Sequence, residues 1–307
     1  MSVATPHHAT PYFDHSGSPN SGRLPPWFRI RLPAEGYGAT ASAVHQRQLH
    51  TVCEEARCPN RSECWGRGTA TFMILGETCT RACAFCAVAT GQPLPADPDE
   101  PRRVAEAARS LGLDFIVLTS VNRDDLADGG AAQFAATLRA LRAALPEAGL
   151  EILTPDFRQC EAAAVATIDA ALPLRADGTT RLVWGHNVET VPSLYREARR
   201  GARYQRSLDL LRQVAALPGV EAKSAVMLGL GERDDEVRAV LCDLRDHGVT
   251  RLAIGQYLRP TPRHLPVLEY LAPERFDRWR DEALTLGFSW VRSGPLVRSS
   301  YHAESAE

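Results

Sequence analysis

Short runs of apolar residues recur along the chain, and each is bounded by polar or small residues. Brief, nearly continuous runs of this kind are typical of parallel strands that are buried on both faces. Six of them are predicted to be strands, at 72–76, 114–120, 150–155, 181–187, 222–230 and 251–257. Between these runs, apolar residues repeat at helical spacing, which predicts amphipathic helices. The clearest four cover 100–112, 130–145, 204–217 and 234–248, and a weaker one covers 38–49.

The alternation of strand and helix predicts an α/β fold with a parallel sheet. A closed TIM barrel has eight such units, whereas this chain shows six. We therefore expect a partial, open TIM-type (β/α)6 barrel whose mouth is covered by N- and C-terminal extensions. The expected division is a disordered N-terminal tail over 1–25, an N-terminal extension over 26–70, the partial barrel over 71–290 and a C-terminal segment over 291–307.

Charge and hydropathy argue against two classes of partner. The formal net charge is −2 and the pI is about 6.5, so there is no broad basic field and nucleic acid is not expected as a partner. No apolar run is long enough to suggest a membrane span. The first residues lack the apolar stretch of a secretory signal. Because closely spaced cysteines without such a signal indicate a reducing compartment, we expect a cytoplasmic protein.

Six of the eight cysteines form two groups of three. The groups are Cys79, Cys83 and Cys86 at C-x3-C-x2-C spacing, and Cys53, Cys58 and Cys64 at C-x4-C-x5-C spacing. A structural zinc site needs four ligands. A [4Fe–4S] cluster has four iron corners, so three cysteines leave one corner open to a small chelator. The amine and carboxylate of S-adenosylmethionine (SAM) can fill such a corner.

Two alternatives stay open for these thiols. The C-x3-C-x2-C group could be a zinc knuckle or isolated buried thiols. The C-x4-C-x5-C thiols could pair with one another or hold zinc alongside a histidine such as His50. The repetition of the incomplete pattern favours two clusters over one shared metal. Cys160 and Cys242 stand alone in the sequence, and isolated cysteines are usually ordinary buried residues.

Longer motifs carry a resemblance to a known family. They are TVCEEARCPNRSECW, GETCTRACAFCAV, TSVNRDDLADGGA, VETVP, MLGLGE, IGQYLRP and GPLVRSSYHAE. Together they resemble the lipoyl synthase family, within the radical SAM superfamily, over about residues 26–305. The C-x3-C-x2-C motif alone marks only the superfamily. Its combination with C-x4-C-x5-C and a terminal RSSY is specific to lipoyl synthases.

The resemblance implies an enzyme that inserts two sulfur atoms, at C6 and C8, into an octanoyl chain amide-linked to a lysine of a carrier domain. The implied carriers are the E2 subunits of 2-oxoacid dehydrogenases and the H protein of glycine cleavage. The implied accessory partners are ferredoxin or flavodoxin as the electron donor, and an iron–sulfur carrier protein.

The resemblance also assigns roles to individual residues. A cluster on Cys79, Cys83 and Cys86 would reduce SAM to methionine and a 5′-deoxyadenosyl radical, which removes hydrogen from the octanoyl chain. An auxiliary [4Fe–4S] cluster on the C-x4-C-x5-C group would give up its sulfides, and its fourth iron would be held by Ser300. From the residues alone, Ser299 is an equal candidate for this role.

Weaker candidates lie at or just after strand ends, where ligands gather in parallel α/β folds. Asn122, Asn187, Glu189 and Arg206 suit the ribose and carboxylate of SAM, and a turn or cap role is the alternative at each position. Lys223 is the only lysine among the 35 Lys and Arg residues, and its role stays open.

Two other functions fit parts of the pattern. One is another radical SAM enzyme that inserts sulfur, either biotin-synthase-like or a methylthiotransferase. Methylthiotransferases usually carry an additional RNA-binding domain, and no such basic segment is visible in this sequence. The non-enzymatic alternative is a zinc-stabilised binding module.

Overall fold

The six predicted strands all form in the computed structural model, which describes residues 24–29, 36–67, 70–172 and 179–304. They are β2 (Thr71–Ile74), β5 (Phe115–Ser120), β6 (Gly149–Leu153), β7 (Leu182–Gly185), β8 (Val220–Leu228) and β9 (Arg251–Gln256). Most of their residues are buried, as continuous apolar runs require. The predicted tail over 1–25 lies almost entirely outside the described residues.

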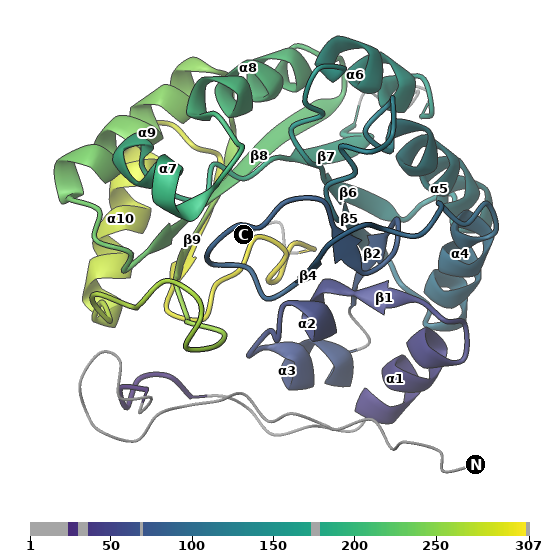
Figure 1. The fold of residues 1–307 in the computed structure, drawn as a ribbon, viewed down its shortest axis with the longest axis horizontal. Coiled ribbons are helices and arrows are strands. Elements are labelled where there is room, and N and C mark those ends of the chain that lie inside the picture. The colour runs from purple at the N-terminus through teal and green to yellow at the C-terminus, as the bar shows by residue number, and fades with distance from the viewer. Residues whose placement is uncertain (1–23, 30–35, 68–69, 173–178, 305–307) are drawn as a thin grey trace.

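The six strands pair in parallel and in chain order within one sheet. The sheet gains a seventh parallel strand, β10 (Trp290–Gly294), beside β9, and the short β1 (His50–Thr51) pairs antiparallel with β2. These additions are its two ends, and no pairing joins them within the described part of the chain. The sheet is therefore an open, partial barrel, which confirms the predicted fold class (Figure 1).

The strand β10 was absent from the sequence-based prediction because WVRSG has only two consecutive apolar residues. As an edge strand it needs burial over only part of its length, and its last three residues are partly exposed. It crosses the boundary at residue 290 that separated barrel from C-terminal segment. The division of the chain into four segments stays a prediction.

Helices form an outer ring around the sheet (Figure 1). The five predicted helices form as α1 (Tyr37–His45), α4 (Glu100–Ser110), α5 (Ala131–Ala144), α8 (Tyr204–Ala215) and α9 (Asp234–Asp246). Two more in the ring were not predicted, α6 (Glu161–Asp169) and α10 (Pro273–Thr285). The first is rich in alanine and offers little contrast between its faces. The second is dense in charge and buries only Phe276, Trp279 and Ala283.

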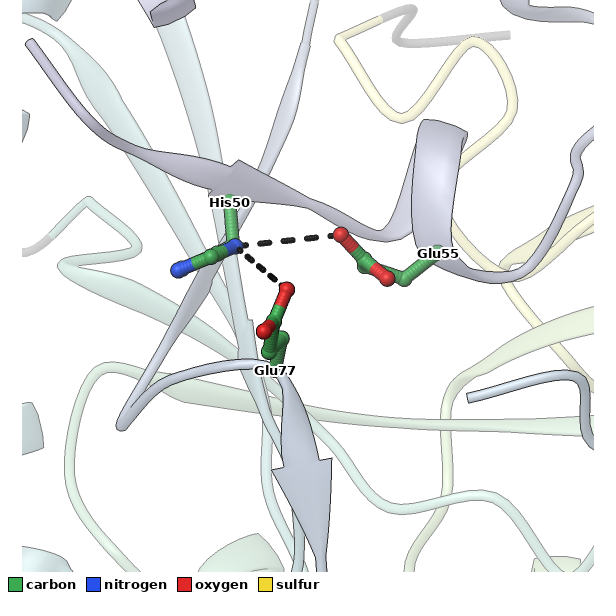
Figure 2. Close-up of side chains that lie close together, drawn as sticks. All are labelled: His50, Glu55 and Glu77. Atoms are coloured by element: carbon green, nitrogen blue, oxygen red, sulfur yellow. Dashed lines mark ion pairs between the residues drawn. The ribbon is translucent and has the colours of Figure 1, made fainter. Parts of the chain in front are cut away.

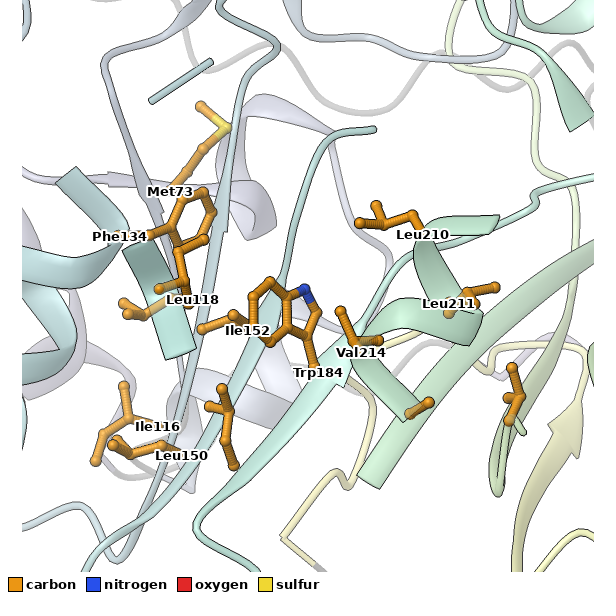
Figure 3. Close-up of a cluster of buried hydrophobic side chains, with 14 of the residues drawn as sticks. Met73, Ile116, Leu118, Phe134, Leu150, Ile152, Trp184, Leu210, Leu211 and Val214 are labelled. Atoms are coloured by element: carbon orange, nitrogen blue, oxygen red, sulfur yellow. The ribbon is translucent and has the colours of Figure 1, made fainter. Parts of the chain in front are cut away.

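The main core lies between the sheet and this ring of helices. Strand residues such as Leu118 and Trp184 and helix residues such as Phe134 and Leu211 are fully buried in one cluster (Figure 3). Burying each such side chain contributes about 1.5–3 kcal/mol. The polar edge of Trp184 is satisfied, since its indole N–H donates to Thr154 at 3.0 Å.

The C-terminal segment that follows β10 runs inside the curve of the sheet, where the C-terminus lies in Figure 1. Val297 and Tyr301 pack against Ala225 of β8 and Ala253 of β9. Gly255 makes this approach possible, since a Cβ there would lie 2.1 Å from the Val297 carbonyl oxygen. The segment thus fills the concave side of the barrel next to the strands' carboxyl ends.

The lone lysine also faces this interior. Lys223 and Ala225 are two residues apart on β8, so their side chains share one face of the sheet. The Lys223 ammonium lies 2.8 Å from both carboxylate oxygens of Glu151 and 4.6 Å from the centre of the Trp290 ring. Lysine and glutamate are almost fully buried. Lys223 and Glu151 therefore form a buried ion pair in the interior of the barrel.

Candidate functional site

One cavity of about 280 Å³ lies at the carboxyl ends of the strands. Its wall includes the ends of β6, β8 and β9, and it brings together residues far apart in the sequence. Both predicted cysteine groups and the terminal serines reach it, through Cys53, Cys58, Cys64, Cys86, Ser299 and Ser300. The tertiary fold therefore brings the upstream trio, Cys86 of the other trio and the RSSY serines to a single space.

The upstream trio is carried by two short helices that lie beside β2. Cys53 lies in α2 (Val52–Glu55), whose N-terminus is capped by the Thr51 hydroxyl accepting from the Glu54 amide. Cys64 lies in α3 (Arg61–Gly66), and Cys58 lies in the turn between them. Burial raises the pKa of Cys53 to about 12 and also raises the pKa values of the other two thiols. Such desolvated thiols suit a metal centre that takes up their negative charge.

The C-x3-C-x2-C trio lies on the loop after β2. Cys79 is in the two-residue strand β3 (Thr78–Cys79), and its sulfur accepts the amides of Arg81 at 3.4 Å and Asn122 at 3.3 Å. Burial raises the pKa of Cys86 to about 12 and raises that of Cys83. All eight cysteines are free, so pairing among them is not part of this structure.

The spacing of the thiols bears on whether each trio holds a zinc ion or an iron–sulfur cluster. Tetrahedral zinc with Zn–S bonds of about 2.3 Å holds its sulfurs about 3.8 Å apart. Among the described residues, only His50, Glu55 and Glu77 place three potential ligand atoms within 4.8 Å of one another (Figure 2). Neither trio meets that spacing. This wider arrangement suits a cubane, which places each iron at its own corner, better than one zinc ion shared by three sulfurs.

His50, the histidine considered as a zinc ligand beside the cysteines, lies next to two carboxylates (Figure 2). Its Nδ1 lies 3.7 Å from Glu55 and 3.8 Å from Glu77, so the imidazole groups with carboxylates rather than with a cysteine trio. Pairing with Glu55 raises the pKa of His50. The cluster of charges ties the upstream extension to the loop that carries the other trio.

The predicted SAM-contact residues divide into two pairs. Asn187 and Glu189 line the cavity, and the Asn187 amide donates to Glu189 at 3.1 Å. Asn122 and Arg206 are not among the residues that line it. Asn122 contacts Cys79 through its backbone, and the Arg206 guanidinium lies 3.1 Å from the buried carboxylate of Asp156. The structure thus brings only the first pair to the cavity wall.

Arg199 was missed by the sequence-based reasoning. Its guanidinium donates to the Asn187 carbonyl and to the Tyr195 hydroxyl, both at 2.9 Å. Burial raises the pKa of Glu189, and the positive charge of Arg199 opposes that shift. A single arginine in a chain with many offers no sequence signal, so only the fold identifies this one.

The RSSY segment is fixed to the upstream extension by side-chain contacts. The Thr71 hydroxyl donates to the Ser300 hydroxyl at 2.9 Å. The Tyr301 hydroxyl donates to Glu63, next to Cys64, at 3.3 Å. Arg298 lies beside Cys58, and burial lowers the pKa of its guanidinium. Both RSSY serines line the cavity, and the hydrogen bond from Thr71 orients the second.

Comparison with known proteins places this site in a family. Residues 73–244 match the model of the radical SAM superfamily. The chain is 53% identical over 284 residues to the lipoyl synthase of Methylococcus capsulatus, covering 92% of this chain and 86% of that one. It is 51% identical over 284 residues to that of Alcanivorax borkumensis, covering 92% and 85%.

Solved structures share the fold at low sequence identity. Methylornithine synthase (PylB) superposes with a TM-score of 0.52 at 13% identity, covering 87% of this chain and 83% of that chain. Streptococcus suis SuiB bound to S-adenosylmethionine superposes with a TM-score of 0.53 at 13% identity, covering 69% and 47%. None of the helices in the described parts of the chain combines the length and apolar character that crossing a bilayer requires. The cysteine motifs, the open parallel barrel and the similarity over nine-tenths of the sequence lead to one assignment: the chain belongs to the lipoyl synthase family of the radical SAM superfamily.

Proposed function

We propose that this chain inserts two sulfur atoms, at C6 and C8, into an octanoyl chain carried on a lysine of a partner domain. The observation that carries the proposal is the shared cavity, whose wall holds one member or more of each cysteine trio together with Ser300. At C6 and again at C8, the carbon that loses hydrogen also receives sulfur, so the two centres must face the same substrate chain. A single cavity between them meets that requirement.

Membership of the family implies one [4Fe–4S] cluster and SAM. We assign that cluster to Cys79, Cys83 and Cys86, and a second, auxiliary [4Fe–4S] cluster to the upstream trio with Ser300 as its fourth ligand. When bound, the first centre supplies the electron that cleaves SAM for hydrogen removal, and the second supplies sulfur. The thiol spacing and burial described above suit both assignments, and a serine oxygen is a weaker partner for iron than a thiolate.

The remaining polar wall suits the amino-acid part of SAM. Glu189 and the Asn187 amide lie together on it. Arg199 donates to the Asn187 carbonyl oxygen, and its positive charge favours the ionised form of Glu189. A carboxylate that is half-buried beside an arginine can accept from an ammonium group. These residues would orient the cofactor against the Cys86 side of the cavity, and Asn122 would help to hold Cys79 rather than the cofactor.

The apolar wall suits the acyl chain. Phe85, Ala225, Met227, Ala253 and Leu258 are among the cavity's lining residues. An octanoyl chain has no polar group beyond its amide, so an apolar lining favours its entry and excludes water. Exclusion of water also protects the reactive centres, which is the part of the chemistry that a protein contributes around such cofactors.

The partner proteins follow from the same proposal. Arg57 and Arg259 line the cavity, and their charge would favour acidic carrier domains. The proposed carriers are dehydrogenase E2 subunits and the glycine cleavage H protein. Ferredoxin or flavodoxin would supply electrons, and an iron–sulfur carrier protein would rebuild the auxiliary cluster. We place the protein in the cytoplasm, where thiols stay reduced.

Mass measurement of an octanoyl-lysine peptide after anaerobic reaction tests the proposal. The expected product carries two added sulfurs. Cys79→Ala should abolish release of 5′-deoxyadenosine, whereas Cys160→Ala, a change outside the cavity wall, should leave it intact. A product with one sulfur or a methylthio group would contradict the proposed reaction. Undiminished release from Cys79→Ala would contradict the assigned cluster.

A further inference from the structure

Thr71, the first residue of β2, touches two proposed ligands of the auxiliary cluster. Its hydroxyl donates to the Ser300 oxygen at 2.9 Å, and its backbone amide lies close to the Cys53 thiol. Its side chain is almost fully buried and lines the shared cavity. One strand residue thus lies between a thiol from the upstream extension and a hydroxyl from the C-terminal segment.

Asn60 has a similar arrangement eleven residues earlier in the chain. Its side-chain amide donates to the Leu296 carbonyl oxygen at 2.7 Å, and its backbone amide lies close to the Cys58 thiol. Asn60 is also almost fully buried. Two residues therefore each join one cysteine, through the main chain, to the C-terminal segment, through the side chain.

We propose that Thr71 is a positioning residue that holds Ser300 in place as the fourth ligand of the auxiliary cluster, with Asn60 fixing the segment that delivers it. This inference rests on the proposed function, because it presumes a cluster on the upstream trio. Thr71 itself binds no iron. It acts through Ser300 and through the register between two remote parts of the chain.

The hydrogen-bond chemistry supports this role. A hydroxyl oxygen has two lone pairs, so Ser300 can accept from Thr71 and still present a lone pair to iron. The contact selects one side-chain rotamer of a serine that would otherwise sample three. Ser299 lines the same cavity, but the hydrogen bond from a buried strand residue goes to Ser300. The structure thus favours the second serine for a reason independent of the sequence motif.

The direction of the effect follows from pre-organisation. Removal of the Thr71 hydroxyl takes away the donor that holds the Ser300 side chain, so Ser300 becomes free to turn away. A typical hydrogen bond contributes about 1 kcal/mol, which corresponds to about a fivefold change in an equilibrium or a rate. Valine fits a strand as well as threonine does, so Thr71→Val removes the donor without disfavouring β2.

The test measures how fast a chelator removes iron from the anaerobically reconstituted full chain, in the absence of SAM and substrate. Thr71→Val should release iron about five- to tenfold faster than the wild type, approaching Ser300→Ala. Thr71→Ser, which restores the hydroxyl, should return the rate to near the wild-type value. Thr137→Val is the matched control, since it removes a buried threonine hydroxyl from α5, far along the chain from either trio.

Each outcome has a defined meaning. Fast release from Thr71→Val that Thr71→Ser reverses supports the positioning role. Wild-type release from Thr71→Val, or equally fast release from Thr137→Val, would overturn it. Wild-type release from Ser300→Ala would instead remove the serine from the ligand set, and a wild-type chain that binds only one cluster would overturn the proposed function itself.

Discussion

Replacement of Gly255 by alanine should displace the C-terminal segment from the barrel. A Cβ at this position would lie 2.1 Å from the Val297 carbonyl oxygen and 3.0 Å from its carbon. Both neighbours are main-chain atoms, so no side chain can rotate away. To reach the 3.4 Å at which ordinary contact begins, the segment must retreat by about 1.3 Å.

That displacement has two measurable consequences. Overpacking of this kind costs about 1–3 kcal/mol of stability. Metal–ligand distances tolerate only about 0.2 Å of variation, and Ser300 lies three residues beyond Val297. We therefore expect Gly255→Ala to lower the free energy of unfolding by about 1–3 kcal/mol and to speed iron release to the level of Ser300→Ala.

Urea denaturation of the iron-free chain and chelator kinetics of the reconstituted chain separate these effects. Gly38→Ala is the matched control, because a Cβ at Gly38 in α1 meets nothing within 4 Å. It should leave iron release unchanged and stabilise the chain by about 0.5–1 kcal/mol, since glycine is unfavourable within a helix. Wild-type stability and wild-type iron release in Gly255→Ala would refute the close-approach argument.

Further predictions concern the buried charges. Lys223→Met should cost about 3–5 kcal/mol, because it leaves Glu151 as an unpaired buried carboxylate, and adding Glu151→Leu should recover most of that loss in urea denaturation. Burial and the charge of Arg199 lower the pKa of His186 to about 4, so the unfolded chain binds this proton first. The contribution of His186 to the free energy of unfolding is therefore fully present above about pH 6.5. It is lost as the pH falls toward 4, by about 3 kcal/mol in total. The pH dependence of unfolding should flatten by that amount in His186→Gln, and an unchanged profile would contradict the assignment. Arg199→Met should weaken SAM binding about tenfold in calorimetry, because the positive charge that keeps the Glu189 carboxylate ionised is then lost. An unaltered affinity would show that SAM binds away from Glu189.

Local patterns predicted the elements that are buried on both faces. The six apolar runs became β2 and β5–β9, because a continuous run can be satisfied only inside a covered sheet. This pattern did not predict β10, because an edge strand needs little burial. Helical periodicity did not predict α6, because its alanines give little difference in hydropathy between the two faces of the helix. The spacing of the six cysteines identified two incomplete ligand sets, and that conclusion needed no knowledge of distance.

The sequence by itself determined the fold class, the two cysteine trios and the family, because periodicity and short-range spacing are properties of neighbouring residues. Only the tertiary structure decided that both trios reach one cavity, that Thr71 contacts Ser300 from 229 positions away, and that Asn187 and Glu189 line the cavity while Arg206 pairs with Asp156. These facts depend on which strand ends meet and on how closely two backbones approach at Gly255. Contacts of that kind arise from packing between remote segments, and no local pattern encodes them.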